Sequence, residues 1–264
     1  MRRQNVAEAL GYQGETFESD GITHDVYRAG TGPAVIVMHE LPGLDAAVVA
    51  VAERIRREGF SVTLPDLLPA ILGRRSVVLN FPRICVVREF RAFALRYDRP
   101  VTRWLQALAA HEHRHAGGPG VGIVGMCFSG GFALAAATRP PITVAIAAEP
   151  SLPFRWRPGA PRDLGMPSAA ENDLAGRSGR AEVCVRAFRY EGDPIAPPER
   201  MVRLKELLGD DVVVEPIKGN DHPVLDRAVG MRKSGPGAPD QSAVPALTES
   251  LRVLRVGLLG ETSL

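Results

Sequence analysis

The sequence predicts an α/β fold in which a mostly parallel central sheet is covered by helices on both faces. Apolar strand-like runs alternate with segments of helical period along most of the 264 residues, a pattern typical of parallel sheets with helical crossovers. One such run, at 121–124, enters a glycine-rich turn and then an alanine-rich helix. No linker divides the chain, so we expect a single domain over residues 1–264, large enough to bury a sizeable core.

The amino-terminal half is expected to begin with an irregular segment over residues 1–14. The elements that follow are a hairpin over 15–29 around Ser19-Asp20-Gly21, strands at 34–39 and 60–64, a helix over 45–58, and helices over 83–96 and 101–113. Gly59 closes the first helix, and Arg99-Pro100 separates the last two. Residues 65–115 include a possible cover over a site.

The carboxyl-terminal half continues the alternation of strands and helices. The expected elements are strands at 121–124, 143–148, 183–190 and 212–214 and helices at 132–137, 197–208 and 243–259. Two stretches rich in Gly, Pro and charge, 151–180 and 230–242, are expected to be surface loops with little core.

The turn after the strand at 121–124 has the form of a nucleophile elbow. Gly125 and Ser129 flank Cys127 two residues before and two after, in the pattern G-x-Nuc-x-G with Ser in place of the second Gly. Such a turn presents the nucleophile at the amino end of the next helix, where free N–H groups favour a thiolate and a developing oxyanion. Ser129 is an alternative nucleophile, although it lies two residues further past the strand.

An elbow of this kind, as in the α/β-hydrolase fold, needs a carboxylate and then a histidine later in the chain. His222 is the only histidine after Cys127, and it lies in a turn-rich loop after the last expected strand. Asp193 ends the preceding expected strand and is the expected acid, with Asp211 and Asp221 as alternatives. The imidazole would take the thiol proton, and the carboxylate would fix the imidazole tautomer.

Two backbone N–H groups are expected to bind the oxyanion. One belongs to Phe128, the residue after the nucleophile. The other comes from the loop after the strand at 34–39, where Leu41 is our candidate. His39 either packs structurally or shapes this loop, and the structural role is favoured. Glu40 is either a solvated residue at a strand end or part of the site.

Four segments together resemble the dienelactone hydrolase family over residues 20–260. They are V-I-V-M-H-E-L-P-G-L, G-I-V-G-M-C-F-S-G-G, Y-E-G-D-P-I-A-P-P-E-R and G-N-D-H, and they occur in the family's order. The resemblance implies the α/β-hydrolase fold and a triad of Cys127, Asp193 and His222. It also implies that Glu40 gates the resting thiol, so that the thiolate forms only when substrate displaces this carboxylate.

The segment over 65–97 resembles the family least, and it would hold substrate-binding arginines. Arg88 and Arg91 are weak candidates for gripping a substrate carboxylate, as are Arg83 and Arg103. An exposed basic helix face explains these four residues equally well.

Composition argues against several other classes of protein. The net charge is only +2, and arginines and acids are scattered, so we expect no nucleic-acid partner. We find no membrane span or signal peptide and expect a cytoplasmic protein. The three cysteines, Cys85, Cys127 and Cys184, are an odd number and argue against a disulfide framework. His111 and His115 have metal-ligand spacing, but a solvated helix end is favoured, so no metal is expected.

We therefore expect a hydrolase that cleaves a small carboxylic ester or lactone, as a monomer or homodimer, without metal or organic cofactor. An acyltransferase or cyclase with the same site is the first alternative. A non-catalytic binding protein on a hydrolase scaffold is the second.

Overall fold

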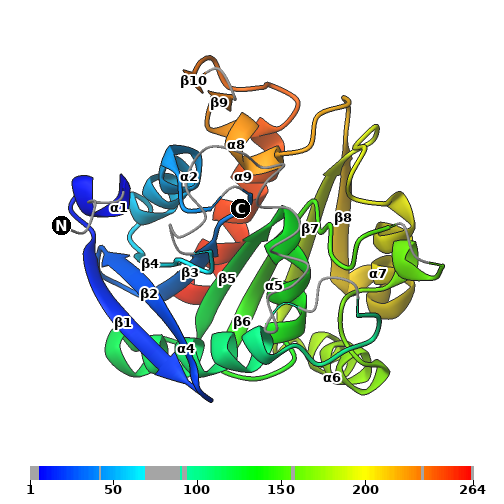
Figure 1. Cartoon of the computed structure of the whole chain (residues 1–264), viewed down its shortest axis with the longest axis horizontal. Coiled ribbons are helices and arrows are strands. Elements are labelled where there is room, and N and C mark those ends of the chain that lie inside the picture. Colours follow the sequence, from blue (N-terminus) through cyan, green and yellow to red (C-terminus); the bar gives the residue numbers. More distant parts are fainter. Residues whose placement is uncertain are drawn as a thin grey trace.

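The computed structural model describes residues 6–41, 43–68, 90, 94–155, 158–232 and 235–262. Eight strands form one sheet in the order β1-β2-β4-β3-β5-β6-β7-β8 (Figure 1). Their bounds are β1 Gln13–Ser19, β2 Ile22–Ala29, β3 Ala34–Met38, β4 Ser61–Pro65, β5 Val121–Met126, β6 Ile142–Ala148, β7 Cys184–Tyr190 and β8 Val212–Ile217. The hairpin β1–β2 is antiparallel and joins β4 antiparallel, whereas all other neighbours are parallel. This confirms the expected mostly parallel sheet.

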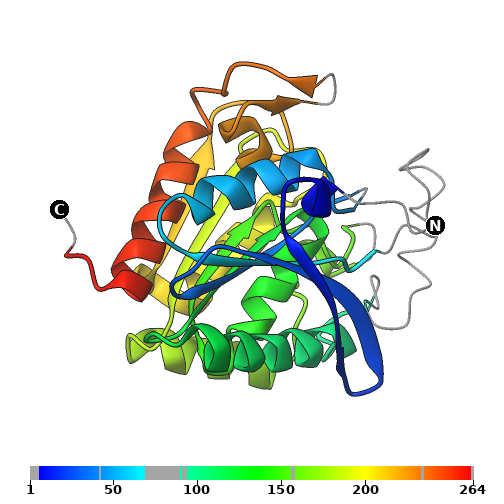
Figure 2. The same cartoon turned by 90° about the vertical axis from the view of Figure 1, so that its left-hand side faces the viewer.

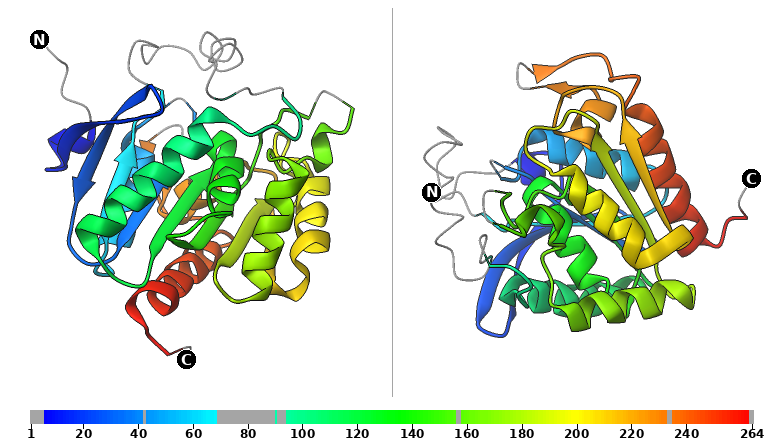
Figure 3. Two further views of the ribbon diagram at one scale, coloured as in Figure 1. Left: turned by 90° about the horizontal axis from the view of Figure 1, so that it is seen from below. Right: turned by 90° about the vertical axis from the view of Figure 1, so that its right-hand side faces the viewer.

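Helices cover both faces of the sheet. Their bounds are α1 Val6–Ala9, α2 Ala46–Arg56, α4 Pro100–Ala116, α5 Gly130–Ala136, α6 Ser168–Gly179, α7 Pro198–Leu208, α8 Val224–Ala228 and α9 Val244–Leu254. Helices α2 and α9 lie on one face, and α4 runs along the opposite face (Figure 2). On that second face α4, α5 and α6 lie side by side (Figure 3, left). Within the described residues, no helix is both long and apolar enough to cross a membrane.

The two faces of the sheet contribute to two separate apolar cores. Along β3, Ala34, Ile36 and Met38 pack into the core beneath α4 and α5, whereas Val35 and Val37 pack into the core beneath α2 and α9. All five side chains are fully buried, because a strand covered on both faces alternates its side chains between two cores. Burial on both faces holds the central strands, and hence the residues at their ends, in a fixed position.

The order of the strands reverses between the parallel neighbours β3 and β5. From β3 the chain passes through α2 to β4 on one side, and from β5 it passes through α5 to β6 on the other. Ligand sites in open α/β sheets form at such a reversal, outside the carboxyl ends of the strands. The register pairs Met38 with Gly125, so Glu40 and Cys127 emerge at the same edge of the sheet.

Residues 151–180 differ from the expected surface loop. They contain α6, and Leu152, Leu164 and Leu174 are fully buried. Arg200 of α7 is also fully buried, and its guanidinium organises the segment. It donates to the carbonyl oxygens of Pro150, Pro153, Ala160 and Asp163 at 2.6–2.8 Å. The composition misled the sequence interpretation because the loop carbonyls are satisfied by a distant buried arginine rather than by water.

The last part of the segment 65–115, which was expected to include a possible cover, is helix α4. Helix α4 packs Trp104, Leu105 and Leu108 into the core beneath the sheet, so it belongs to the fold itself. Of the helix expected at 83–96, only Phe90 and residues 94–96 are described, and they are not helical. Residues 230–242 carry a small hairpin, β9 Met231–Arg232 and β10 Gly235–Pro236.

Candidate functional site

Cys127 sits on a strained turn between β5 and α5. Its φ angle is +54°, a left-handed conformation that a non-glycine residue adopts only where the surroundings enforce it. A Cβ atom at Gly125 would lie 2.4 Å from the carbonyl oxygen of Ser129, so this position needs glycine. The structure thus has the tight strand–turn–helix geometry that an elbow requires.

Ser129 supports the turn and does not face the site. Its hydroxyl donates to the carbonyl oxygen of Met126 at 2.8 Å and accepts the N–H of Met126 at 2.9 Å. The side chain is fully buried. A hydroxyl engaged at both its donor and its acceptor sites is poorly placed to attack a substrate, which disfavours the alternative nucleophile.

His222 and Asp193 form a close pair. His222 Nδ1 lies 2.9 Å from Oδ1 and 2.8 Å from Oδ2 of Asp193. Asp193 Oδ1 also accepts the N–H groups of Ile195 at 2.7 Å and Ala196 at 3.0 Å. These bonds fix the carboxylate at the end of β7, and the carboxylate orients the imidazole so that Nε2 faces away from it.

The two alternative acids lie elsewhere. Asp221 binds the guanidinium of Arg227, with Oδ2 2.5 Å from Nε. Asp211 is exposed in the turn before β8. Asp193 is therefore the acid that the structure brings to His222.

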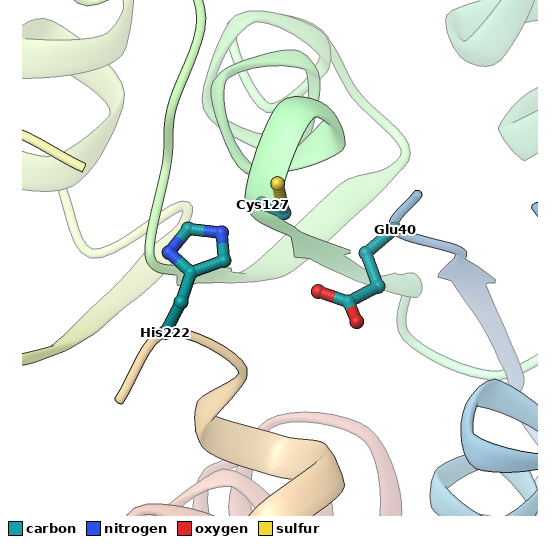
Figure 4. A group of neighbouring side chains, drawn as sticks. All are labelled: Glu40, Cys127 and His222. Atoms are coloured by element: carbon teal, nitrogen blue, oxygen red, sulfur yellow. The ribbon is translucent and has the colours of Figure 1, made fainter. Parts of the chain in front are cut away.

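Three side chains from distant parts of the chain converge at the carboxyl edge of the sheet. Glu40 follows β3, Cys127 follows β5, and His222 precedes α8; one donor atom from each lies within 4.8 Å of the other two (Figure 4). His222 Nε2 is buried and has no hydrogen-bond partner among the described residues. The nitrogen is thus available to a group that enters between the three side chains.

The thiol of Cys127 is held in its neutral form. Burial raises the pKa of this thiol well above its ordinary value, and the neighbouring carboxylate of Glu40 raises it further. Hydrogen bonds from the Ser151 hydroxyl, at 3.4 Å from Sγ, and from the Phe128 N–H act in the opposite direction. The resting site therefore disfavours the thiolate, while groups that would stabilise it are already in place.

Glu40 is one of three neighbouring acidic side chains. Burial, Asp226 and Glu149, in that order, raise the pKa of the Glu40 carboxyl well above its ordinary value, and Asp226 hydrogen-bonds with it. Burial likewise raises the pKa of Glu149 well above its ordinary value and that of Asp226 to about 6. Three crowded carboxyl groups cannot all be charged, so the group retains protons near neutral pH.

Sequence reasoning missed Glu149, Ser151 and Asp226. Glu149 is fully buried, and its Oε2 accepts the N–H of Val224 at 3.1 Å, which ties the end of β6 to the start of α8 beyond the His222 loop. Their position in the chain could have indicated Glu149 and Ser151 as site residues, because both follow the strand next to the elbow strand.

The two candidate oxyanion donors belong to the elbow and to the loop after β3. The N–H of Phe128 is directed at the Cys127 sulfur, and Leu41 directly follows Glu40 in the loop after β3.

His39, at the start of the loop after β3, is fully buried. Its Nδ1 bonds to the carbonyl oxygen of Glu40 at 2.8 Å, and its Nε2 accepts the N–H of Leu67 at 3.0 Å. These bonds give His39 a structural role in shaping the loop.

Of the candidate arginines and the metal-spaced histidines, those that the structure describes lie on α4. Arg88 and Arg91, like Arg83, lie outside the described residues. Arg103 is exposed on α4, where it binds Asp98 at 2.8 Å. The rings of His111 and His115 pack against each other at a tilt near the far end of the same helix, with centroids 4.2 Å apart.

The sheet order and the elbow after β5 define an α/β-hydrolase fold. The model of the dienelactone hydrolase family matches residues 23–156, just over half of the chain. The chain therefore belongs to the dienelactone hydrolase family. No curated protein sequence matches it closely enough to count as a relative.

Solved structures of similar proteins support the same fold. A putative dienelactone hydrolase from Klebsiella pneumoniae subsp. pneumoniae is 18% identical with a TM-score of 0.65, covering 92% of this chain and 96% of its own. A dienelactone hydrolase-like promiscuous phosphotriesterase from metagenomic libraries is 18% identical with a TM-score of 0.63, covering 94% and 98%. A cold-adapted esterase from an Arctic intertidal metagenomic library is 15% identical with a TM-score of 0.60, covering 94% of each chain. At these identities the likeness extends to the fold alone.

Proposed function

We propose that this hydrolase cleaves a small carboxylic ester or lactone, with Cys127 as nucleophile, His222 as general base and Asp193 as the acid that orients it. The observation that carries the proposal is the convergence of Cys127 and His222 on one space, with His222 Nδ1 bonded to Asp193 at 2.8 Å. The donor atoms are farther apart than in a hydrogen bond, as is common before substrate binds.

The reaction runs through a thioester. His222 Nε2 takes the thiol proton while the sulfur attacks the substrate carbonyl carbon, and Asp193 stabilises the imidazolium that forms. The imidazolium then gives its proton to the departing alkoxide, which leaves Cys127 acylated. Water attacks the thioester carbonyl with His222 again as base, and the carboxylic acid departs as the thiol reforms. A lactone opens by the same steps, except that its alcohol stays attached.

The oxyanion is bound by the backbone N–H groups of Phe128 and Leu41 in this proposal. The Phe128 N–H already contacts the sulfur, so it lies next to the carbon that the sulfur attacks. Preorganised donors of this kind typically contribute about 3–4 kcal/mol of transition-state stabilisation each.

Glu40 controls when the thiolate forms. Its carboxyl group lies against the thiol and raises the thiol pKa. Substrate that enters between Glu40 and Cys127 would move the carboxyl group away and remove that effect. The nucleophile would then be activated by the substrate rather than exposed permanently to oxidants and alkylating agents.

The test is hydrolysis of a panel of activated short-chain esters and small unsaturated lactones by wild type, Cys127→Ala and Ser129→Ala. We expect turnover by wild type, none above background by Cys127→Ala, and residual turnover by Ser129→Ala in proportion to its folded fraction. Turnover unaffected by Cys127→Ala would reject the nucleophile, and no turnover of any member by folded wild type would reject the substrate class.

A further inference from the structure

The thiol, imidazole and carboxylate at this site form a set of donors that matches a metal centre. Sulfur of Cys, nitrogen of His and oxygen of Glu are the three ligand types that Zn²⁺ prefers in proteins. The donor atoms of Glu40, Cys127 and His222 lie within 4.8 Å of one another. Tetrahedral bonds of about 2.0–2.3 Å place donor atoms roughly 3.3–3.7 Å apart, so each side chain needs to move by only about 1 Å.

The surroundings of His222 prepare it as a ligand. Its Nδ1 is committed to Asp193 at 2.8 Å, which leaves Nε2 as the free nitrogen. Nε2 is buried and has no hydrogen-bond partner among the residues that the structure describes. A metal-bound imidazole almost always gives its other N–H to a carboxylate or carbonyl, and this second bond fixes the ring and strengthens the ligand.

The charge of the site also suits a divalent cation. A thiolate at Cys127 and a carboxylate at Glu40 carry two negative charges, and His222 binds a metal in its neutral form. The bound site would thus be neutral overall, which removes the cost of burying charge.

We propose that Glu40, Cys127 and His222 bind one Zn²⁺ ion reversibly and that this ion blocks the site. The metal replaces the proton of the thiol and any proton on the Glu40 carboxyl group, which are released to solvent, and three protein ligands leave the fourth position to water. Because the ion occupies both the sulfur and Nε2, neither can act on substrate while it is bound. The proposed Zn²⁺ binding does not depend on the proposed hydrolase function, whereas the proposed inhibition rests on it.

Binding is tested on the full-length chain after removal of metals with a chelator. Zn²⁺ is titrated by calorimetry, and Co²⁺ is titrated as a spectroscopic probe that reports thiolate ligation by a charge-transfer band. Wild type should bind one ion per chain and show the thiolate band. Loss of an outer partner of a ligand already weakens metal binding about 10–100-fold, so Cys127→Ser and the nearly isosteric Glu40→Gln should each weaken it at least about tenfold.

Two control variants exclude other donors. Cys184→Ser removes the other cysteine within the described residues. Cys184 is only partly buried. The double variant His111→Ala and His115→Ala removes the adjacent histidine pair on α4. Both controls should bind Zn²⁺ like wild type. Absence of saturable binding by wild type, undiminished binding by folded Glu40→Gln or Cys127→Ser, or loss of binding in either control would overturn the proposal.

Inhibition is measured separately, so that failure of the metal site and failure of the hydrolase function give different results. Zn²⁺ should protect Cys127 from iodoacetamide, and a chelator should restore labelling. One-to-one binding without turnover of any ester or lactone would leave the metal site standing and reject the proposed substrate class. Ester turnover without saturable Zn²⁺ binding would reject the metal site and leave the hydrolase.

Discussion

Ser151 holds Cys127 at two points. Its hydroxyl lies 3.4 Å from Cys127 Sγ, and its N–H donates to the Cys127 carbonyl at 3.0 Å. The backbone bond joins the segment after β6 to the elbow, and the hydroxyl bond stabilises a thiolate against the opposing effect of burial. Ser151 thus links the position of the nucleophile to its ionisation.

Replacement of Ser151 by alanine should raise the thiol pKa further. A hydrogen bond to a charged group contributes about 1.5–3 kcal/mol, and Ser151→Ala removes this contribution from the thiolate. The pH profile of iodoacetamide labelling at Cys127 should therefore move upward. The control is Ser178→Ala. Ser178 is also buried but lies on α6, so this change should leave the pH profile unchanged. An unmoved profile in Ser151→Ala would show that the hydroxyl does not act on the thiol.

Replacement of Asp193 by asparagine should remove most of the activity and keep the fold. The amide oxygen can still accept the N–H groups of Ile195 and Ala196, but the amide NH₂ group opposes the Nδ1–H tautomer of His222. In a serine protease with a Ser-His-Asp triad the same change lowers kcat about 10⁴-fold. Asp221→Asn is the matched control, because it removes the charge that pairs with Arg227 while its amide oxygen can still accept the N–H of His222. Equal activities of the two variants would contradict the assignment of the acid.

Asp226 should make the protein less stable as pH rises. Its pKa is raised by burial from 3.8 to about 6 in the folded chain, so the folded state binds more protons than the unfolded state between these values. Its stabilising contribution is present below about pH 4 and is lost as pH rises through about 6. Asp226→Asn lacks this pH-dependent contribution. Between about pH 4.5 and about pH 7, the unfolding free energy of wild type should therefore fall by about 1–3 kcal/mol relative to that of Asp226→Asn.

Denaturant unfolding at these two pH values measures the gain. The control is Asp173→Asn on α6, where the carboxylate is half exposed and pairs loosely with Arg139 at 3.8 Å. This control should follow the wild-type pH dependence. If Asp226→Asn also follows it, the carboxyl groups around Glu40 do not share protons in the way we describe.

Local sequence was sufficient to predict the elbow and the mostly parallel sheet. Gly125, Cys127 and Ser129 define a turn whose geometry depends on only a few residues, and the apolar runs on each side define a buried strand and helix. Asp193 and His222 could be placed because the fold orders its acid and base along the chain. These features are encoded within short segments or by chain order, so one sequence reveals them.

Tertiary contacts explain what the sequence did not predict. Glu149 and Asp226 are acidic residues that would ordinarily be solvated, and nothing local indicates that both become buried beside Glu40. The segment 151–180 has the composition of a loop, yet Arg200 from α7 satisfies its carbonyl groups. In each case the deciding partner is distant in the chain, where neither periodicity nor turn signals carry information.

The most direct test of the account is to locate the acyl group during turnover of an activated ester. The reaction is quenched with acid, and the intact chain and its peptides are weighed by mass spectrometry. We predict one acyl group per chain on the peptide that contains Cys127, and none in Cys127→Ala. An acyl group on Ser129 or Ser151, or full turnover by Cys127→Ala, would contradict the thiol mechanism.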